Sequence, residues 1–245
     1  MNKGESSLTS LISAFSRAYH SQFYTPKIFD DYLAKDLITE KGLNDIQTNM
    51  VQGIQFFNKE IAEKLNGNTE VLLKWIVQIQ LSPTPLARAA YCEKVLLNEV
   101  MLGLQQYVIL GAGLDTFSFR HPELEHILEI DHPATQQFKK TRLDEAHFKL
   151  PSNVHFVAMD FADENLFKEK GLSNRVDNMV KMAAVSGEPM KSCFTYEEME
   201  KMLEKSGLLI YEHLSPSNIN QLYFDNREDY LTAFETIHYV HAVKK

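Results

Sequence analysis

The spacing of apolar and polar positions divides the chain into a helical first part and a second part in which strands alternate with helices. Apolar residues at positions 8, 11, 12 and 15 recur three and four residues apart, which predicts an amphipathic helix over 6–20. The same periodicity predicts largely helical structure over 45–80 and a helix over 86–101. We therefore expect residues 1–104 to form a helical cap.

The boundaries of the helix over 86–101 are marked by particular residues. Thr84 can cap a helix, and Pro85 suits its first position because proline has no N–H to leave unpaired there. Gly103 is typical of a residue just past a helix end. The α/β part of the chain is therefore expected to begin near residue 105.

The second part contains short apolar runs separated by helical segments. The predicted strands lie at 106–110, 126–130, 154–159, 208–213 and 236–243. The predicted helices lie at 111–120 (a turn and short helix), 133–147 and 195–205, the last opened by the capping-box sequence Thr195 to Glu198. Strands that alternate with helices favour a parallel α/β sheet, so 105–245 is expected to be a Rossmann-like core that forms one integrated domain with the cap.

A Gly-x-Gly turn follows the first strand directly. Gly111 and Gly113 permit a tight turn and let a ligand approach the backbone without a Cβ in the way. Asp131 ends the next strand, twenty positions after Gly111, where its carboxylate can accept hydrogen bonds from a ribose diol. Asp160 ends the third strand, where a carboxylate or a neighbouring amide can face adenine. This spacing is typical of a site for a nucleoside-bearing cofactor.

The residues of this motif leave two alternative interpretations, one of the cofactor class and one of the role of Asp115. Thr116 stands where the dehydrogenase fingerprint has its third glycine, which makes a nicotinamide-dependent oxidoreductase the weaker interpretation. Asp115 is better explained as a local helix cap than as a ligand contact.

The charge and the composition of the chain argue against several classes of partner and site. The formal net charge of −8 argues against nucleic acid as the default partner, because phosphate binding requires clustered Lys and Arg. The two cysteines, Cys92 and Cys193, form no metal-ligand spacing, so neither a metal site nor a disulfide framework is expected. No signal-like segment and no membrane-spanning run is found, which favours a cytoplasmic protein without a membrane partner.

Three sequence blocks resemble a known family. Residues 107–120 (YVILGAGLDTFSFR), 129–139 (EIDHPATQQFK) and 156–161 (FVAMDF) resemble the S-adenosylmethionine-dependent methyltransferases of the leucine carboxyl methyltransferase-like family. Shorter matches are Arg17-Ala18-Tyr19, Phe29-Asp30-Asp31, Thr84 to Arg88, Gly187 to Met190 and Leu214 to Ser217. The resemblance extends over nearly the whole chain and implies a Rossmann-like class I methyltransferase sheet with S-adenosyl-L-methionine as the cofactor.

The resemblance also implies roles for individual residues. The cofactor-binding residues expected from it are Arg88, Gly111, Gly113, Asp131, Asp160 and Phe161. Gly111 would lie against the methionine part, and Arg88, otherwise an ordinary surface helix residue, would pair with its carboxylate. Asp131 would hold the ribose hydroxyls. Asp160 and Phe161 would bound the adenine.

The implied reaction moves a methyl group from a sulfonium to an oxygen of a carboxylate or hydroxyl on a small molecule. The thioether is already a good leaving group, so the protein mainly aligns the two reactants and excludes water. Tyr19, His20 and Tyr24 lie in a segment that could cover the site, but structural roles explain them better. No catalytic residue is assigned.

The chain departs from the family after its third strand. The family sheet continues there with a strand, a helix and a further strand, yet no buried-strand run occurs between 161 and 191. A piece of about 40–60 residues is therefore expected to be absent, by the usual sizes of such elements.

This absence has consequences for the sheet and for activity. The family strand order 3-2-1-4-5-7-6 would lose its middle, and strand 106–110 would become an edge. An apolar edge strand invites association, so we expect either a smaller re-paired sheet or a homodimer that covers the edge. The alternative function is a catalytically impaired or non-catalytic relative that acts as a binding or scaffold protein.

Overall fold

The computed structural model describes residues 7–65, 68–122, 124–160 and 194–245. The chain divides into two compact units, Met1–Asp163 and Glu164–Lys245, and each is described by itself. The sequence-based division at residue 104 stays a prediction. None of the helices in the described parts of the chain is both long and apolar enough to cross a membrane.

The first unit begins with helices, as the apolar periodicity predicts. They are α1 (Leu8–Phe23), η1 (Ala34–Leu37), α2 (Glu40–Phe57), α3 (Lys59–Lys64), α4 (Thr69–Ile76), η2 (Val77–Leu81) and α5 (Pro83–Met101). The side chains of Ser7, Thr39, Asn58 and Asn68 cap α1, α2, α3 and α4 by accepting a hydrogen bond from a backbone N–H of the first turn. Short polar residues therefore set where these four helices begin.

The start of α5 differs from the prediction. The helix begins at Pro83 rather than after Thr84, and its N-cap residue, Ser82, makes no capping hydrogen bond through its side chain. The π-helical turn η2 leads directly into α5, so the chain arrives in helical conformation and needs no cap. Gly103 lies just past the helix end with a φ of 99°, as expected for a glycine there.

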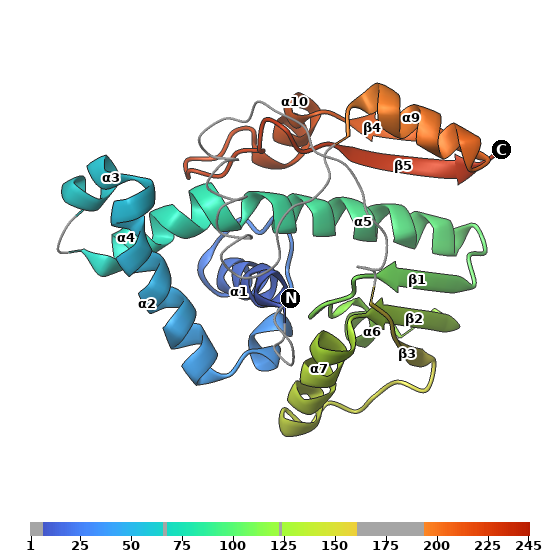
Figure 1. Cartoon of the computed structure of the whole chain (residues 1–245), viewed down its shortest axis with the longest axis horizontal. Coiled ribbons are helices and arrows are strands. Elements are labelled where there is room, and N and C mark those ends of the chain that lie inside the picture. The colour runs from blue at the N-terminus through green and yellow to red at the C-terminus, as the bar shows by residue number, and fades with distance from the viewer. Residues whose placement is uncertain (1–6, 66–67, 123, 161–193) are drawn as a thin grey trace. The chain divides into compact units, whose positions relative to one another are not determined.

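A three-stranded parallel sheet follows (Figure 1). Its strands β1 (Gln106–Leu110), β2 (His126–Asp131) and β3 (Val154–Ala158) lie in the order β1-β2-β3. Crossovers containing α6 (Phe117–Arg120) and α7 (Pro133–Glu145) join them. The sequence predicts these strands and helices, and the observed strand order is the 3-2-1 half of the order expected for the family. The predicted α/β architecture is therefore confirmed for this part of the chain.

The two faces of this sheet are unequal. Ile127 and Val154 pack into a core with Leu96 of α5, and Phe117 and Leu124 complete it. The other face exposes apolar side chains: Val108 is 47%, Leu110 68% and Val157 37% accessible. Parallel sheets are normally covered on both faces, and within the described residues of this unit one face of the sheet has no such cover.

Strand β1 pairs with β2, and no other strand among the described residues pairs with it. The segment 161–191, in which we predict a missing strand–helix–strand piece, lies largely outside the described residues. The shortened sheet therefore stays a prediction.

The second unit contains a two-stranded antiparallel sheet. Its elements are α9 (Tyr196–Lys205), β4 (Leu208–Leu214), α10 (Pro216–Ile219), η4 (Asn220–Phe224) and β5 (Tyr239–Lys244). The capping box of Thr195 and Glu198 is present at the start of α9, as predicted. Strands β4 and β5 pair with each other, with an irregularity between Ile210 and Glu212.

Candidate cofactor site

The Gly-x-Gly turn lies at the carboxyl end of β1. Gly111 and Gly113 have φ values of 70° and 52°, a region that other residues rarely adopt. The backbone N–H of Gly111 donates to the carbonyl oxygen of Ile130 at 2.8 Å, which holds the turn beside the end of β2. A Cβ added to Gly111 would meet nothing within 4 Å, whereas one added to Gly113 would lie 2.6 Å from Oγ of Ser10. The turn therefore has open space at Gly111, and α1 fills the space at Gly113.

Asp131 stands at the end of β2 beside this turn. Its Oδ2 accepts a hydrogen bond from the N–H of Gly113 at 2.5 Å, and its Oδ1 accepts one from the N–H of His132 at 2.6 Å. A carboxylate offers about four acceptor positions, and the side chain is only half-buried. The carboxylate of Asp131 therefore keeps acceptor positions for the predicted contact with a ribose, in addition to the two that accept from backbone N–H groups.

Asp160 follows β3 on the same edge of the sheet. The N–H of Met159 donates to the carbonyl oxygen of Asp131 at 2.8 Å, which joins the ends of β2 and β3. The side chain of Asp160 is 53% exposed, and its Oδ2 lies 3.6 Å from Nε2 of His132. Phe161, the other residue predicted to bound the adenine, lies outside the described residues.

His132 was not among the predicted site residues. It caps α7, where its Nδ1 accepts a hydrogen bond from the N–H of Ala134 at 3.2 Å. The signal that could have identified it is its position, between the carboxylate that ends a strand and the proline that opens a helix.

Arg88 lies on the exposed side of α5, and no described residue forms an ion pair or hydrogen bond with its guanidinium. One helical turn further on, Sγ of Cys92 contacts the hydroxyl of Tyr107 on β1 at 3.6 Å. Helix α5 runs alongside β1 in the opposite direction (Figure 1). Arg88 is therefore displaced from Tyr107 toward the carboxyl end of β1, the end that leads into Gly111.

Two polar side chains, Cys92 of α5 and Tyr107 near the amino end of β1, are poor nucleophiles. Burial raises the pKa of the Cys92 thiol and, more strongly, that of the Tyr107 hydroxyl. Both groups are therefore protonated near neutral pH, and neither supplies a base or nucleophile.

The residues predicted to cover the site have structural contacts. His20 is fully buried, and its Nε2 accepts a hydrogen bond from the N–H of Ile28 at 2.9 Å. Tyr19 and Tyr24 lie with ring centroids 5.8 Å apart. These contacts agree with the structural interpretation of all three residues.

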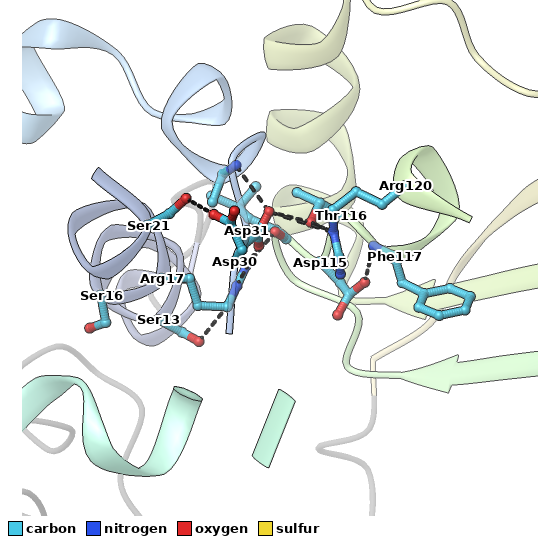
Figure 2. A network of polar contacts seen from close by, with 12 residues as sticks. Ser13, Ser16, Arg17, Ser21, Asp30, Asp31, Asp115, Thr116, Phe117 and Arg120 are labelled. Atoms are coloured by element: carbon cyan, nitrogen blue, oxygen red, sulfur yellow. Dashed lines mark hydrogen bonds and ion pairs between the residues drawn. The ribbon is translucent and has the colours of Figure 1, made fainter. Parts of the chain in front are cut away.

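A buried network fastens the N-terminal segment to the residues after the glycine turn (Figure 2). Nε of Arg17 donates to Oδ2 of Asp31 at 2.8 Å, and its Nη2 donates to the carbonyl oxygen of Leu114 at 2.8 Å. The hydroxyl of Thr116 donates to the other oxygen of Asp31 at 2.6 Å. Asp115 accepts a hydrogen bond from the N–H of Phe117 at 2.7 Å, so its contact is local, but the N-cap of α6 is Thr116 and not Asp115 as predicted.

Arg120 extends this network to α5. Its Nη1 and Nη2 donate to the two oxygens of Glu93 at 2.9 and 2.7 Å, a bidentate pair. Burial opposes the charged guanidinium, but these bonds outweigh it and raise the pKa of Arg120. His121 approaches the same carboxylate, with Nε2 3.0 Å from Oε1.

A second buried cluster lies under the sheet edge. Glu129 of β2 and Lys139 of α7 form an ion pair with both side chains 1% exposed. Glu129 also accepts a hydrogen bond from the hydroxyl of Ser118 at 2.9 Å, and Lys139 donates to the carbonyl oxygen of Asp115 at 2.6 Å. The cluster therefore ties β2, α6 and α7 to the turn that follows the glycines.

The site presents chemistry that suits a nucleoside cofactor with a charged tail. Open backbone, acceptor oxygens at two strand ends and an exposed guanidinium fit a methionine tail, a ribose and an adenine. Within the described ranges, no three His, Cys, Asp or Glu side chains lie close enough to share a metal ion.

Comparison with known proteins agrees with this chemistry. The leucine carboxyl methyltransferase family model matches residues 10–184. The Bacillus subtilis (strain 168) protein YktD, assigned as an S-adenosyl-L-methionine-dependent methyltransferase, is 57% identical over the full length of both chains. A Mycobacterium avium (strain 104) protein with the same assignment is 32% identical over 87 residues, covering 35% of this chain and 28% of that protein. Rv0893c of Mycobacterium tuberculosis (strain ATCC 25618 / H37Rv), also so assigned, is 35% identical over 80 residues, covering 32% of this chain and 25% of its own.

The comparison with YktD also bears on chain length. The alignment has 304 positions and this chain has 245 residues, so at least 59 positions (304 minus 245) have no residue here. That excess is close to the size of the strand–helix–strand piece whose absence the sequence predicts. Because the family model covers more than half of the chain and YktD matches its whole length, the chain belongs to the leucine carboxyl methyltransferase family, and its cofactor is S-adenosylmethionine.

Proposed function

We propose that the chain is an O-methyltransferase that transfers the methyl group of S-adenosylmethionine to a carboxylate or hydroxyl oxygen of a small molecule. The observation that carries the proposal is the meeting of Gly111, Asp131 and Asp160 at adjacent strand ends, joined by backbone hydrogen bonds. Ligands of open α/β sheets bind at this end of the strands.

Each of these residues has a distinct role in the proposal. The open backbone at Gly111 lies against the methionine part, and Arg88 pairs with its carboxylate through a planar guanidinium. Asp131 accepts hydrogen bonds from the ribose hydroxyls. Asp160, together with Phe161, bounds the adenine.

The cofactor supplies a methyl group activated by its sulfonium. The acceptor oxygen forms a bond to the methyl carbon while the carbon–sulfur bond breaks and its electron pair stays on sulfur. A carboxylate acceptor needs no base, so the residues of the chain have to bind, orient and exclude water.

A second candidate function is a relative that binds the cofactor but does not transfer its methyl group. The exposed apolar side chains of Val108 and Leu110 favour it, because the piece predicted to be absent would line the methyl-transfer side in the family. A homodimer that covers β1 is part of the same proposal.

Calorimetric titration separates these candidates. We expect heat on adding S-adenosylmethionine, none on adding NAD, and a large loss of affinity in Asp131→Ala. Formation of S-adenosylhomocysteine, measured with panels of carboxylic acids and hydroxy compounds, then tests transfer. Binding without turnover on either panel supports the second candidate, and wild-type protein without binding contradicts both.

A further inference from the structure

We propose that Asp115 is a further binding residue of the cofactor site, whose carboxylate pairs with the α-ammonium of the methionine tail. The inference rests on the proposed function, in which Arg88 pairs with the carboxylate of the same tail. A methionine tail carries both charges on one carbon atom, and Arg88 and Gly111 leave its ammonium without an anion. Asp115 supplies that anion.

Asp115 lies directly beside the glycine turn. Its N–H donates to the carbonyl oxygen of Ala112 at 2.9 Å, which closes a four-residue turn with Gly113 and Leu114 at its centre. The first and last Cα atoms of such a turn lie within about 7 Å of each other. Asp115 is therefore close to the residue that follows Gly111, where the backbone is open.

One oxygen of the Asp115 carboxylate remains for a ligand. Oδ1 accepts a hydrogen bond from the N–H of Phe117 at 2.7 Å, whereas no described residue bonds to Oδ2. Figure 2 shows this second oxygen pointing away from the N–H of Phe117. The residue is half-buried, and Thr116 is the N-cap of α6. Capping of that helix therefore does not account for the second oxygen.

The backbone of Asp115 is held in place. Its carbonyl oxygen accepts a hydrogen bond from Nζ of Lys139 at 2.6 Å, and Lys139 is itself buried in an ion pair with Glu129. Because the N–H is bonded to Ala112, both backbone groups of Asp115 are engaged. A carboxylate on a fixed backbone loses less conformational freedom when it binds a ligand, which favours affinity.

The cation that lies nearest along the chain, Arg120, is engaged elsewhere. Its Nη1 and Nη2 donate to Glu93 at 2.9 and 2.7 Å, and its Nε donates to the hydroxyl of Thr116 at 3.1 Å. In the part of the chain that the structure describes, no basic side chain forms an ion pair with Asp115. An ammonium group brought by a ligand can therefore pair with this carboxylate.

Asp115 and Arg88 act on the same neighbouring group. Burial is the main cause of the raised pKa of the Cys92 thiol; the charge of Asp115 raises it further, and the charge of Arg88 lowers it. Sγ of Cys92 contacts the hydroxyl of Tyr107 at 3.6 Å, and the ring of Tyr107 packs against that of Phe117 with centroids 5.3 Å apart. This series of contacts joins the surroundings of Arg88 to those of Asp115. An anion and a cation placed in this way suit a zwitterionic tail.

The test uses ligands that differ only in the charges of the tail. S-adenosylhomocysteine carries both charges, its desamino analogue keeps only the carboxylate, and its decarboxylated analogue keeps only the ammonium. Each is titrated by calorimetry into wild-type protein, Asp115→Asn and Arg88→Ala, with thermal unfolding measured in parallel. Asparagine keeps an oxygen acceptor for the N–H of Phe117 and removes the charge.

We expect wild-type protein to bind S-adenosylhomocysteine about tenfold or more tightly than the desamino analogue, the order expected for a hydrogen bond between charged groups. Asp115→Asn should lose most of this preference and should bind the desamino analogue no more weakly than wild-type protein does. Its melting temperature should stay close to wild type, because asparagine makes the same local turn.

Arg88→Ala is the reciprocal variant. It should keep the preference for the amino group and lose the preference for the carboxylate, which is the ratio of the affinities for S-adenosylhomocysteine and the decarboxylated analogue. If both variants lost both preferences equally, the separate assignment of the two charges would be wrong.

Two further results would overturn the inference in distinguishable ways. If wild-type protein binds S-adenosylhomocysteine and Asp115→Asn keeps the full preference for the amino group, the role of Asp115 is wrong while the proposed function stands. If wild-type protein binds none of the ligands, the proposed function fails and the inference fails with it. If Asp115→Asn melts well below wild type, Asp115→Ser replaces it in the same comparison, since a serine hydroxyl also accepts from the N–H of Phe117.

Discussion

Two sets of charged side chains occur in the first unit, and their surroundings differ sharply. Arg17, Asp31, Glu129 and Lys139 lie inside the protein and are fully engaged with one another and with backbone groups. Arg88, Asp131 and Asp160 lie at the rim of the sheet, at least partly exposed. Both sets lie in or beside the sequence blocks that resemble the methyltransferase family. The difference shows that these blocks specify a buried scaffold as well as the exposed residues of the candidate site.

The buried charged side chains hold the glycine turn in place, and the side chains at the rim lie around that turn. Lys139 holds the carbonyl oxygen of Asp115, and Arg17 holds that of Leu114. Both carbonyls belong to the turn that contains Gly111 and Gly113. A change in the buried set should therefore lower stability first, whereas a change at the rim should lower cofactor affinity with little effect on stability.

The largest expected effect comes from Lys139→Met. Removing one partner of a buried ion pair leaves the charge of Glu129 uncompensated, which typically costs about 3–5 kcal/mol. Urea denaturation measures the loss. Adding Glu129→Gln should restore much of it, and a double variant as unstable as the single one would show that the pair is not the cause.

Asp131→Asn should weaken S-adenosylmethionine binding by about 10- to 150-fold, since a hydrogen bond to a charged group contributes about 1.5–3 kcal/mol. Its free energy of unfolding should change much less than that of Lys139→Met, because the asparagine side chain keeps an oxygen acceptor. Calorimetry and denaturation on the same preparation check both statements. Unchanged affinity would remove Asp131 from the site.

Arg88→Ala should lower the affinity for S-adenosylmethionine about tenfold, by the loss of a charge-assisted pair. The unfolding free energy should stay within about 0.5 kcal/mol of wild type, because the side chain is exposed and without a described partner. Arg88→Lys should recover only part of the affinity, since lysine lacks the planar fork. A variant that loses stability instead would place Arg88 with the buried set.

Val108→Lys tests whether a second copy covers the open side of the sheet. A charge on an exposed apolar strand opposes edge-to-edge pairing, so a wild-type dimer should become a monomer while cofactor affinity is unchanged. Light scattering after size exclusion measures the mass. A wild-type monomer would contradict the proposed homodimer.

The smallest expected effect lies in the second unit. Nδ1 of His238 lies 2.7 Å from Nε2 of His213, and burial, followed by this neighbour, lowers the pKa of His238. The unfolded chain then binds more protons than the folded one, so stability should fall as the pH drops through about 6.5, the ordinary histidine pKa. His238→Asn should flatten this slope between pH 5 and 7, as measured by thermal unfolding.

Local features of the fold were predictable from the sequence because their causes are local. The parallel strands, the capping box at Thr195 and the positive φ of Gly111 all follow from residue type and spacing over a few positions. The start of α5 was wrong because a preceding π-helical turn replaced the cap, and no sequence rule marks such a turn. The proximity of His132 to Asp160 was missed because the two residues are 28 positions apart in the sequence.

The α/β class, the glycine turn and the acidic strand ends can be predicted from the order of the residues, since these features depend on backbone preference and hydrophobic period. Which charges are buried together follows from the packing of distant segments. Thr116 and Asp31 are 85 positions apart, and no periodicity links them. Burial also separates two acidic residues that lie two positions apart on β2: Glu129 faces the core and pairs with Lys139, while Asp131 is half-buried at the rim, where we propose that it binds the ribose.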